Sequence, residues 1–390
     1  MISRRGAGLR SRRISLWIFP VAAMLLISAW QGATVAANFG GNWTALFCTG
    51  ALQPHPPLVY REHIYLFPDS TGYDGQFFHY MAHDPLLRSD LKTYFDDPRL
   101  RYRRILIPLL AYGLAFGRTR LIDPLYELLT LASIGLGVYW CGLLARQAQL
   151  SAAWGLMFLP LPATAITADR LVVDAALAAL TAALLCYRET PWKVLVVLAC
   201  AALTRETGLL LIAAYGVYSL WRREIRGAAI ALLSGAPAAG WYLYLRARTT
   251  HATLPLTLFP FTSILQAFAN PWQYPPGTPF PDMVRAADYL ALAGLVLAFA
   301  MACVCWIRRP SDLAHLAAMA FTAMGLMMNV SGTLQSVYHF GRIYTPLLLC
   351  LAAVAARNRK PWLLAPLALI LPRIAIQLAP QALGIVRWIV

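Results

Sequence analysis

The residues best suited to chemistry in this 390-residue chain lie in the stretch STGYDGQFFHYMAHDP, residues 70–85. Glycines close to Asp74 on both sides allow the backbone to turn tightly and present its carboxylate. Such a carboxylate can act as a general base toward a hydroxyl group; the alternative is that Asp74 is a turn residue or a helix N-cap. His79 and His83 have the four-residue spacing of a metal pair. No pattern such as HExxH accompanies them, so we assign no metal ligand.

Arginines are concentrated downstream, in DDPRLRYRRIL, residues 96–106. A guanidinium group binds phosphate oxygens in bidentate fashion, so Arg101, Arg103 and Arg104 are candidate ligands of a lipid-linked phosphate. Arg342, in SVYHFGRIYTPLL, is a further candidate where a later helix is expected to enter the membrane. For all four, contact with lipid headgroups or snorkelling is the alternative.

Two further stretches place charges within apolar sequence. In TADRLVVDAAL, Arg170 and Asp174 are four residues apart, which predicts a pair on one helix face. Asp169 is expected near the N-terminus of that helix, where the helix dipole favours a carboxylate. In LTRETGLLL, Arg205 and Glu206 interrupt a hydrophobic run, which is costly unless the site is wet or the charges are paired.

Composition places these residues in a membrane protein. The chain is 59% hydrophobic and only 13% charged, with a mean hydropathy of +0.57, whereas about a quarter of a soluble domain is charged. Apolar runs near the roughly 18–20 residues that cross a bilayer recur along it. We therefore attribute the net charge of +16 to cytoplasmic loops and anionic headgroups rather than to nucleic acid. The seven cysteines form no disulfide framework and no CxxC metal pattern.

The elements that must position the site are predicted to be an all-α bundle of about eleven transmembrane helices in a single module, residues 1–390. The first helix covers residues 14–37; a signal peptide has a similar pattern, but the apolar stretch is long enough to favour an uncleaved helix. The basic residues before it predict a cytoplasmic N-terminus. Residues 38–120 then form a long extracytoplasmic loop, and the remaining helices occupy residues 121–378. They are expected to begin near residues 121, 150, 170, 192, 206, 226, 286, 312, 340 and 361.

Two short helices are expected in the long loop. The apolar part of residues 103–117 is too short to span, and an interfacial or re-entrant helix there leaves the later basic loops in the cytoplasm. Residues 76–82 suit an amphipathic helix on the membrane surface, with Phe77, Phe78 and Tyr80 as interfacial anchors. Almost all the unusual polar residues then face outward.

These residues, in this order, resemble the GT-C superfamily of membrane glycosyltransferases, which use polyprenyl-phosphate sugars. The resemblance is strongest over residues 1–220. Asp74 in GYDGQFF looks like the acidic residue of the first outside loop, and RYRRILIPLLAYGL looks like the RYxxxPLLAxL stretch of glycolipid mannosyltransferases. LPATAITADRLVVDAALAAL is similar to their luminal tip, ALTRETGLLL to a segment of uncharacterised bacterial relatives, and GRIYTPLL to a late arginine motif that touches the lipid phosphate. The chain has no Asp-x-Asp motif in that loop, which leaves its dependence on a divalent metal open. It also has no large soluble C-terminal domain of the kind found in oligosaccharyltransferases.

The resemblance implies a transferase in a bacterial inner membrane. It would move a sugar from a polyprenyl-phosphate donor to a lipid or glycan acceptor at the extracytoplasmic face, with inversion. Asp74 would be the base, and Arg103, Arg104 or Arg342 would stabilise the leaving phosphate. The expected substrate-binding set is Tyr73, Gln76, His79, Arg101, Arg103, Arg104, Asp169, Arg170, Arg205, Glu206 and Arg342.

Two other functions fit parts of the pattern. A polytopic transporter or lipid flippase also has many helices and intramembrane charges. It is disfavoured because the unusual residues gather at one face and no internal repeat is visible. A non-catalytic membrane subunit with the same fold is the third alternative. We expect no nucleic-acid partner.

Overall fold

The structure is a computed structural model that describes residues 16–250, 259–274, 277–328 and 333–390. It is 76% helical, which confirms the all-α prediction. Among the described residues, paired strands occur only as β1 (Thr49–Gly50) and β2 (Leu66–Phe67), which lie parallel. The arginines between residues 4 and 13, which predict the orientation of the chain, lie outside the described part.

Five helical segments are long and apolar enough to cross a membrane. They are α1 (Ile18–Asn38), α6 (Thr119–Gln147), α11 (Ile225–Ser234) together with α12 (Ala236–Arg248), α14 (Pro281–Arg308), and η5 (Pro361–Leu364) together with α18 (Ala365–Ile389). The pair α16 (Val337–Ile343) and α17 (Thr345–Asn358), bent by 54°, makes a sixth if it is one span. By length and composition the described residues support a membrane protein, with fewer spans than the eleven predicted.

Shorter helices fill the space between these spans. They are η3 (Ala152–Phe158), α7 (Pro162–Arg170), α8 (Asp174–Tyr187), α9 (Pro191–Thr204), η4 (Glu206–Gly208), α10 (Leu209–Trp221), α13 (Thr262–Ala269) and α15 (Leu313–Met327). A 14-residue helix is about 21 Å long, less than the roughly 30 Å of a hydrocarbon core. Short helices of this kind place their ends, where backbone and side chains are polar, inside the bundle.

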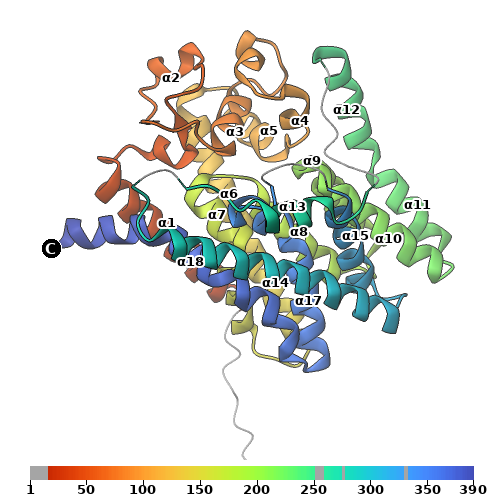
Figure 1. The fold of residues 1–390 in the computed structure, drawn as a ribbon. Helices are drawn as coiled ribbons and strands as arrows, with labels where there is room; N and C mark the ends of the chain where they lie inside the picture. Colours follow the sequence, from red (N-terminus) through yellow and green to blue (C-terminus); the bar gives the residue numbers. More distant parts are fainter. Residues whose placement is uncertain (1–15, 251–258, 275–276, 329–332) are drawn as a thin grey trace, which may run out of the picture.

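Residues 39–118, which we call the cap, lie together at one end of the helical body (Figure 1). The cap contains η1 (Trp43–Phe47), α2 (Pro57–Arg61), α3 (Asp74–His83), η2 (Asp90–Tyr94), α4 (Pro98–Tyr102) and α5 (Leu106–Leu114). With nine residues, α5 is about 14 Å long. It is therefore too short to span, as the sequence predicts.

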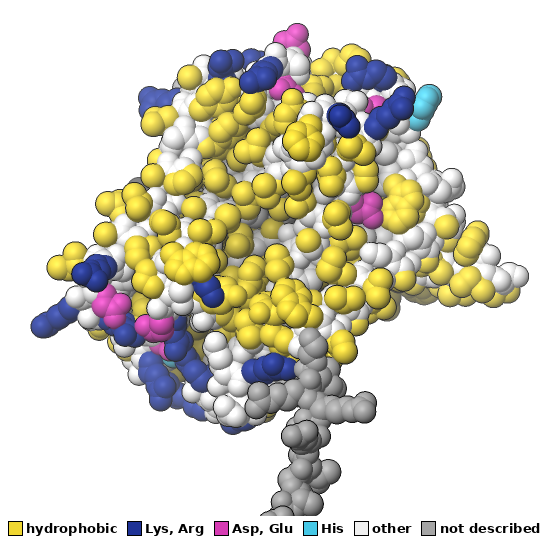
Figure 2. All heavy atoms as spheres, turned by 180° about the vertical axis from the view of Figure 1, so that it is seen from behind, with side chains coloured by type: hydrophobic (Ala, Val, Ile, Leu, Met, Phe, Trp, Pro, Cys, Tyr) yellow, Lys and Arg dark blue, Asp and Glu magenta, His cyan; other side chains and the backbone are white. Residues whose placement is uncertain are grey.

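Several aromatic side chains of the cap are part of the hydrophobic core. Phe77, Phe78 and Tyr80 on α3 are all buried, and Phe77 and Tyr80 pack against Phe95 within the cap. The prediction that these three aromatic side chains anchor a surface helix in the membrane is therefore wrong. Outside the cap, hydrophobic side chains cover the middle of one face of the molecule, and Lys and Arg gather toward its two ends (Figure 2). This distribution fits a protein surrounded by lipid.

Candidate functional site

Asp74 is the first residue of α3 and lies at the base of the cap. Its carboxylate is buried and faces three arginines. Oδ1 lies 2.6 Å from Nη1 of Arg101; Oδ2 lies 2.6 Å from Nη2 of Arg342 and 3.5 Å from Nη1 of Arg104. The Tyr73 ring packs under the Arg342 guanidinium, 4.9 Å from its centroid. Asp74 is thus the centre of an ion-pair cluster and not a solvent-exposed turn residue.

The arginines around Asp74 have further carboxylate partners. Arg104 makes a bidentate contact with Glu206, with Nε–Oε2 at 2.9 Å and Nη2–Oε1 at 2.7 Å. Arg205 is in contact with Asp174, and Asp174 Oδ2 is also 3.5 Å from Nη1 of Arg342. We call these seven side chains the charged cluster: Asp74, Arg101, Arg104, Asp174, Arg205, Glu206 and Arg342.

The charged cluster is built where short helices begin and end. Asp74 and Asp174 are the first residues of α3 and α8, and Arg205 separates α9 from η4. Arg104 lies in the turn between α4 and α5, and Arg342 lies on the short helix α16. Residues far apart in sequence therefore meet in one place, and four of the predicted site arginines are among them.

Charge pairing controls the ionisation of two carboxylates in the cluster, Asp74 in the cap and Glu206 at the start of η4. Burial acts to raise the pKa of Asp74, but Arg101, Arg342 and Arg104 lower it well below its usual range. Burial acts likewise on Glu206, yet Arg104 and Arg205 bring its pKa to about 2. Both carboxylates are therefore ionised at neutral pH. Asp74 is in the form that a base requires, although its strong pairing makes it a weak base.

Three arginine side chains keep unused hydrogen-bond donors at this place. The Nε atoms of Arg103, Arg205 and Arg342 are buried and have no hydrogen-bond partner among the residues that the structure describes. The Arg103 guanidinium lies over the ring of Tyr242, 5.3 Å from its centroid. Because a buried donor without a partner is costly, these groups indicate a place prepared for an anionic acceptor.

Two residues predicted to line a sugar site, Tyr73 and Gln76, are used in different ways. Tyr73 borders the charged cluster, and its hydroxyl donates to the Tyr338 carbonyl at 2.7 Å. Gln76 is buried, accepts from the Gly50 amide at 3.3 Å, and donates to the Thr71 carbonyl at 3.1 Å. Its side chain thus holds the loop before α3, and Tyr73 is the better placed of the two for a substrate.

Asp169 and Arg170 form a separate network beside the charged cluster. Arg170 Nε lies 3.0 Å from Asp169 Oδ2, and Asp169 accepts from the hydroxyl of Tyr338 at 2.6 Å and from the amide of Gln381 at 2.9 Å. The predicted pair of Arg170 with Asp174 is wrong, because α7 ends at Arg170 and α8 begins at Asp174. For the same reason Asp169 lies near the C-terminus of a helix, not near the N-terminus as predicted.

His79 lies toward the other end of α3 from Asp74. Its ring is fully buried, stacks on Phe47 with centroids 4.3 Å apart, and has Nε2 3.0 Å from Asp123 Oδ1. The structure therefore does not bring His79 to the charged cluster. Asp123 is 44 residues away in the chain, so no local pattern predicts this pair.

A cavity of about 650 Å³ is lined in part by residues that are close in sequence to members of the charged cluster. Its lining includes the apolar and aromatic side chains of Ile105, Leu109, Leu203, Trp241 and Tyr244, with Arg88 and Arg248. Ile105 directly follows Arg104, and Leu203 precedes Arg205 by two residues. Two residues of the cavity wall are therefore sequence neighbours of arginines in the cluster.

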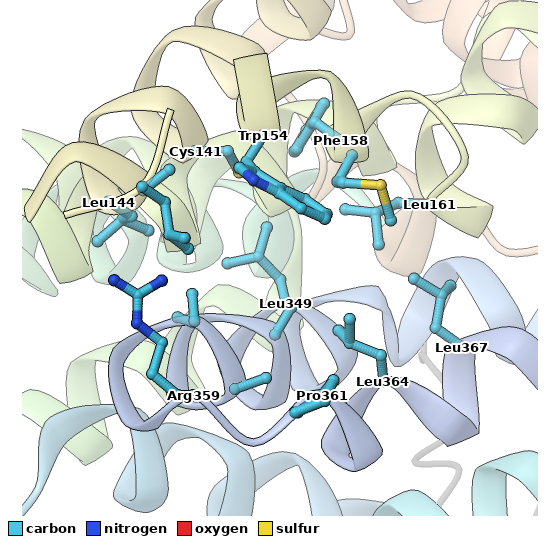
Figure 3. A pocket seen from close by; sticks show the side chains of 17 residues that line it. Cys141, Leu144, Trp154, Phe158, Leu161, Leu349, Arg359, Pro361, Leu364 and Leu367 are labelled. Carbon is cyan, nitrogen blue, oxygen red and sulfur yellow. The ribbon is translucent and has the colours of Figure 1, made fainter. Parts of the chain in front are cut away.

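A second cavity, of about 330 Å³, lies between α6 and η3 on one side and α17, η5 and α18 on the other (Figure 3). It is lined almost wholly by apolar side chains such as Leu144, Trp154 and Leu364, with Arg359 beside it. Ala145, in its lining, is 22 residues along α6 from Asp123, or about 33 Å. This cavity is thus remote from the cap.

No family model, curated protein or solved structure matches the chain.

Proposed function

We propose that the protein is an integral membrane glycosyltransferase that transfers a sugar from a polyprenyl-phosphate donor to a hydroxyl acceptor, as the GT-C resemblance implies. The observation that carries the proposal is the charged cluster: a buried carboxylate contacted by three arginines, beside buried arginine Nε atoms that have no hydrogen-bond partner among the described residues. Guanidinium groups suit phosphate oxygens, and a carboxylate suits proton abstraction from a hydroxyl. Groups that suit binding of the donor phosphate and a group that suits proton abstraction from the acceptor hydroxyl are therefore found in one place.

The cavity of about 650 Å³ supports a lipid-linked donor in particular. Its apolar and aromatic walls suit the first units of a polyprenyl chain, and Arg104 lies next to the wall residue Ile105. A lipid chain held there would bring its phosphate to the arginines of the cluster.

In the proposed reaction, the acceptor oxygen attacks the anomeric carbon on the face opposite the phosphate. A new carbon–oxygen bond forms, the bond to the phosphate oxygen breaks, and the electron pair leaves with polyprenyl phosphate. Asp74 takes the acceptor proton, and Arg104, Arg205 or Arg342 stabilises the charge that develops on the phosphate. The sugar configuration inverts.

Binding of the donor would also prepare the base. Both oxygens of Asp74 are paired, one with Arg101 and the other with Arg342. An incoming phosphate competes for these guanidinium groups, and each loosened pair removes an interaction that lowers the pKa of Asp74. The carboxylate then becomes a stronger base only when the donor is present.

We further propose that the cap faces the extracytoplasmic side of a bacterial inner membrane, with the N-terminus in the cytoplasm and about eleven membrane-embedded helical segments. The alternation of basic loops supports this orientation. The acceptor is proposed to be a lipid or a glycan on that side.

The test is consumption of the donor. Purified protein in nanodiscs, where both leaflets are accessible, is incubated with a panel of polyprenyl-phosphate hexoses and candidate acceptors. We expect one donor to be consumed with release of polyprenyl phosphate. A flippase would leave every donor intact in nanodiscs and would move the donor between leaflets in proteoliposomes. That result would overturn the proposal.

A further inference from the structure

A second group of ionisable side chains lies at the opposite end of α3 from Asp74. His79 and His83 occupy one face of α3, Asp123 lies in the second turn of α6, and Glu62 directly follows α2. One ligand atom from each of the four lies within 4.8 Å of all the others. We call this group the His–carboxylate cluster. It joins two helices of the cap to a membrane-spanning helix.

The distances within the cluster match those between ligands of one metal ion. Zinc binds nitrogen and oxygen ligands at about 2.0–2.1 Å, so two ligands at tetrahedral positions are about 3.3 Å apart. Asp123 Oδ1 lies 3.0 Å from Nε2 of His79 and 3.1 Å from Nε2 of His83, and His83 Nε2 lies 3.7 Å from Glu62 Oε2. Small side-chain adjustments would suffice to place four ligands around one ion.

Burial and charge also suit a divalent cation. The side chains of His79 and His83 are 0% and 3% exposed, whereas those of Asp123 and Glu62 are 24% and 22% exposed. The histidine side chains are thus shielded from solvent, and an ion can reach the group from the side of the partly exposed carboxylates. Two carboxylates neutralise the charge of a divalent ion, and neutral imidazole with carboxylate is a ligand set that zinc accepts.

The histidine rings are held in place by packing. His79 stacks on Phe47, and its centroid lies 4.9 Å from that of His83 with the rings nearly perpendicular. The Nδ1 atoms of both rings are buried without a hydrogen-bond partner among the described residues. Both rings therefore use only Nε2, and both direct it to the same carboxylate. The ligand atoms of both rings and of the carboxylate thus lie together, as the ligands of a single ion do.

We propose that Glu62, His79, His83 and Asp123 bind one divalent transition-metal ion, with Zn²⁺ the best match, that fastens the cap to α6. Its four ligands come from three separate elements, so the ion closes long loops of chain in the way that a structural zinc site does. The ion would hold the C-terminal half of α3 and thereby fix the helix whose first residue is Asp74. The site does not depend on the transferase reaction, since a protein that consumes no sugar donor can still bind the ion.

The test measures binding of the metal itself. Protein purified with a chelator and then freed of it is titrated with Zn²⁺, and the metal retained per chain is measured by mass spectrometry. We expect one ion per chain, a higher unfolding temperature with Zn²⁺, and visible absorption of tetrahedral character with Co²⁺. The Co²⁺ spectrum needs no variant, so it tests the site even if ligand substitutions prevent folding.

A pair of histidine variants locates the ion. His83→Gln removes a ligand, whereas His63→Gln changes an exposed histidine next to Glu62 that is not part of the cluster. His83→Gln should weaken Zn²⁺ binding by at least about tenfold, and His63→Gln should leave it unchanged. Failure of the folded wild-type protein to bind either Zn²⁺ or Co²⁺ would overturn the proposal. Equal binding by the two variants would do the same, because the ion would then lie elsewhere.

Discussion

Replacing Asp74 by asparagine tests the proposed base with little change in shape. Removing one partner of a buried ion pair costs about 3–5 kcal/mol when the other charge is left alone. Here each arginine keeps another carboxylate: Asp96 for Arg101, Glu206 for Arg104 and Asp174 for Arg342. We therefore expect the smaller loss of about 1–3 kcal/mol that is typical of one unsatisfied buried contact. The variant should fold.

Transfer activity should fall much further than stability. Loss of a general base reduces a rate by about 10²–10⁴-fold, and an asparagine amide cannot accept the acceptor proton. The rate of donor consumption is measured in nanodiscs at saturating donor, next to the unfolding temperature of the same preparation. A large loss of rate with a modest change in unfolding temperature is the expected result.

The matched control is Asp96→Asn, which removes the other carboxylate partner of Arg101. The Asp96 side chain is 54% exposed, and its pair with Arg101 has Nη2–Oδ2 at 2.7 Å. An exposed pair contributes only about 0–1 kcal/mol, so both activity and stability should stay close to wild type. A folded Asp74→Asn protein with full activity, or an Asp96→Asn protein with the same loss of activity, would refute the assignment of Asp74 as the base.

Three further predictions concern Arg342, the ionisation of Asp74 and the orientation of the cap in the membrane. Arg342→Lys leaves one ammonium group in place of a guanidinium that contacts both Asp74 and Asp174. The loss of one charged hydrogen bond, about 1.5–3 kcal/mol, should lower kcat/KM by about 10–150-fold. An unchanged kcat/KM would contradict the proposed role of this arginine. Because the pKa of Asp74 is lowered in the free protein, its stabilising ion pairs persist above the ordinary carboxyl pKa of about 4 and are lost only as pH falls through the lower folded-state pKa. The pH profile of kcat/KM should therefore show no acidic limb above about pH 5, whereas the profile of kcat, which reports the substrate complex, should show its limb at higher pH; coincident limbs would argue against release of Asp74 by the donor. Cysteines placed at the exposed positions Asp96 and Lys360 should be labelled from opposite sides of the membrane, and labelling from the same side would contradict the proposed orientation.

Much of the helix pattern is predictable from local sequence. Hydropathy, together with proline and charged residues between apolar runs, predicts that helices begin near residues 192, 312 and 361. In the structure α9, α15 and η5 begin at Pro191, Leu313 and Pro361. These starts depend on residues adjacent in the chain. Whether a helix crosses the membrane depends on its length and on the helices beside it. The sequence therefore predicts more transmembrane helices than the five or six that are long and apolar enough to span.

The break between α7 and α8 shows where local reasoning fails. No Gly or Pro marks it; Leu171 takes a left-handed backbone conformation with φ 44°, and its carbonyl accepts from the Tyr126 hydroxyl at 3.0 Å. Contacts from another helix therefore stabilise a turn at residues 171–173, which the sequence assigns to the first turn of a helix expected to begin near residue 170. The break separates Arg170 from Asp174, and Asp174 forms its ion pair with Arg205 instead.

Long-range pairing decides the rest of the site. The sequence identifies Asp74, Arg104, Arg205, Glu206 and Arg342 as unusual, because charges in apolar surroundings need partners. It does not pair Arg104 with Glu206, which is 102 residues away. Asp123 and Glu62 are missed for the same reason, since each is an ordinary helix-end carboxylate until the fold brings the two histidines beside it.

Recognition of a lipid-linked phosphate by the charged cluster can be measured as binding of polyprenyl phosphate. Native mass spectrometry in detergent can compare this lipid with the corresponding polyprenol, which has the same chain and no phosphate. We predict that polyprenyl phosphate binds at least about tenfold more tightly, as one charge-assisted hydrogen bond implies, and that Arg342→Gln removes most of the difference. Equal binding of the two lipids by the wild-type protein would contradict the account.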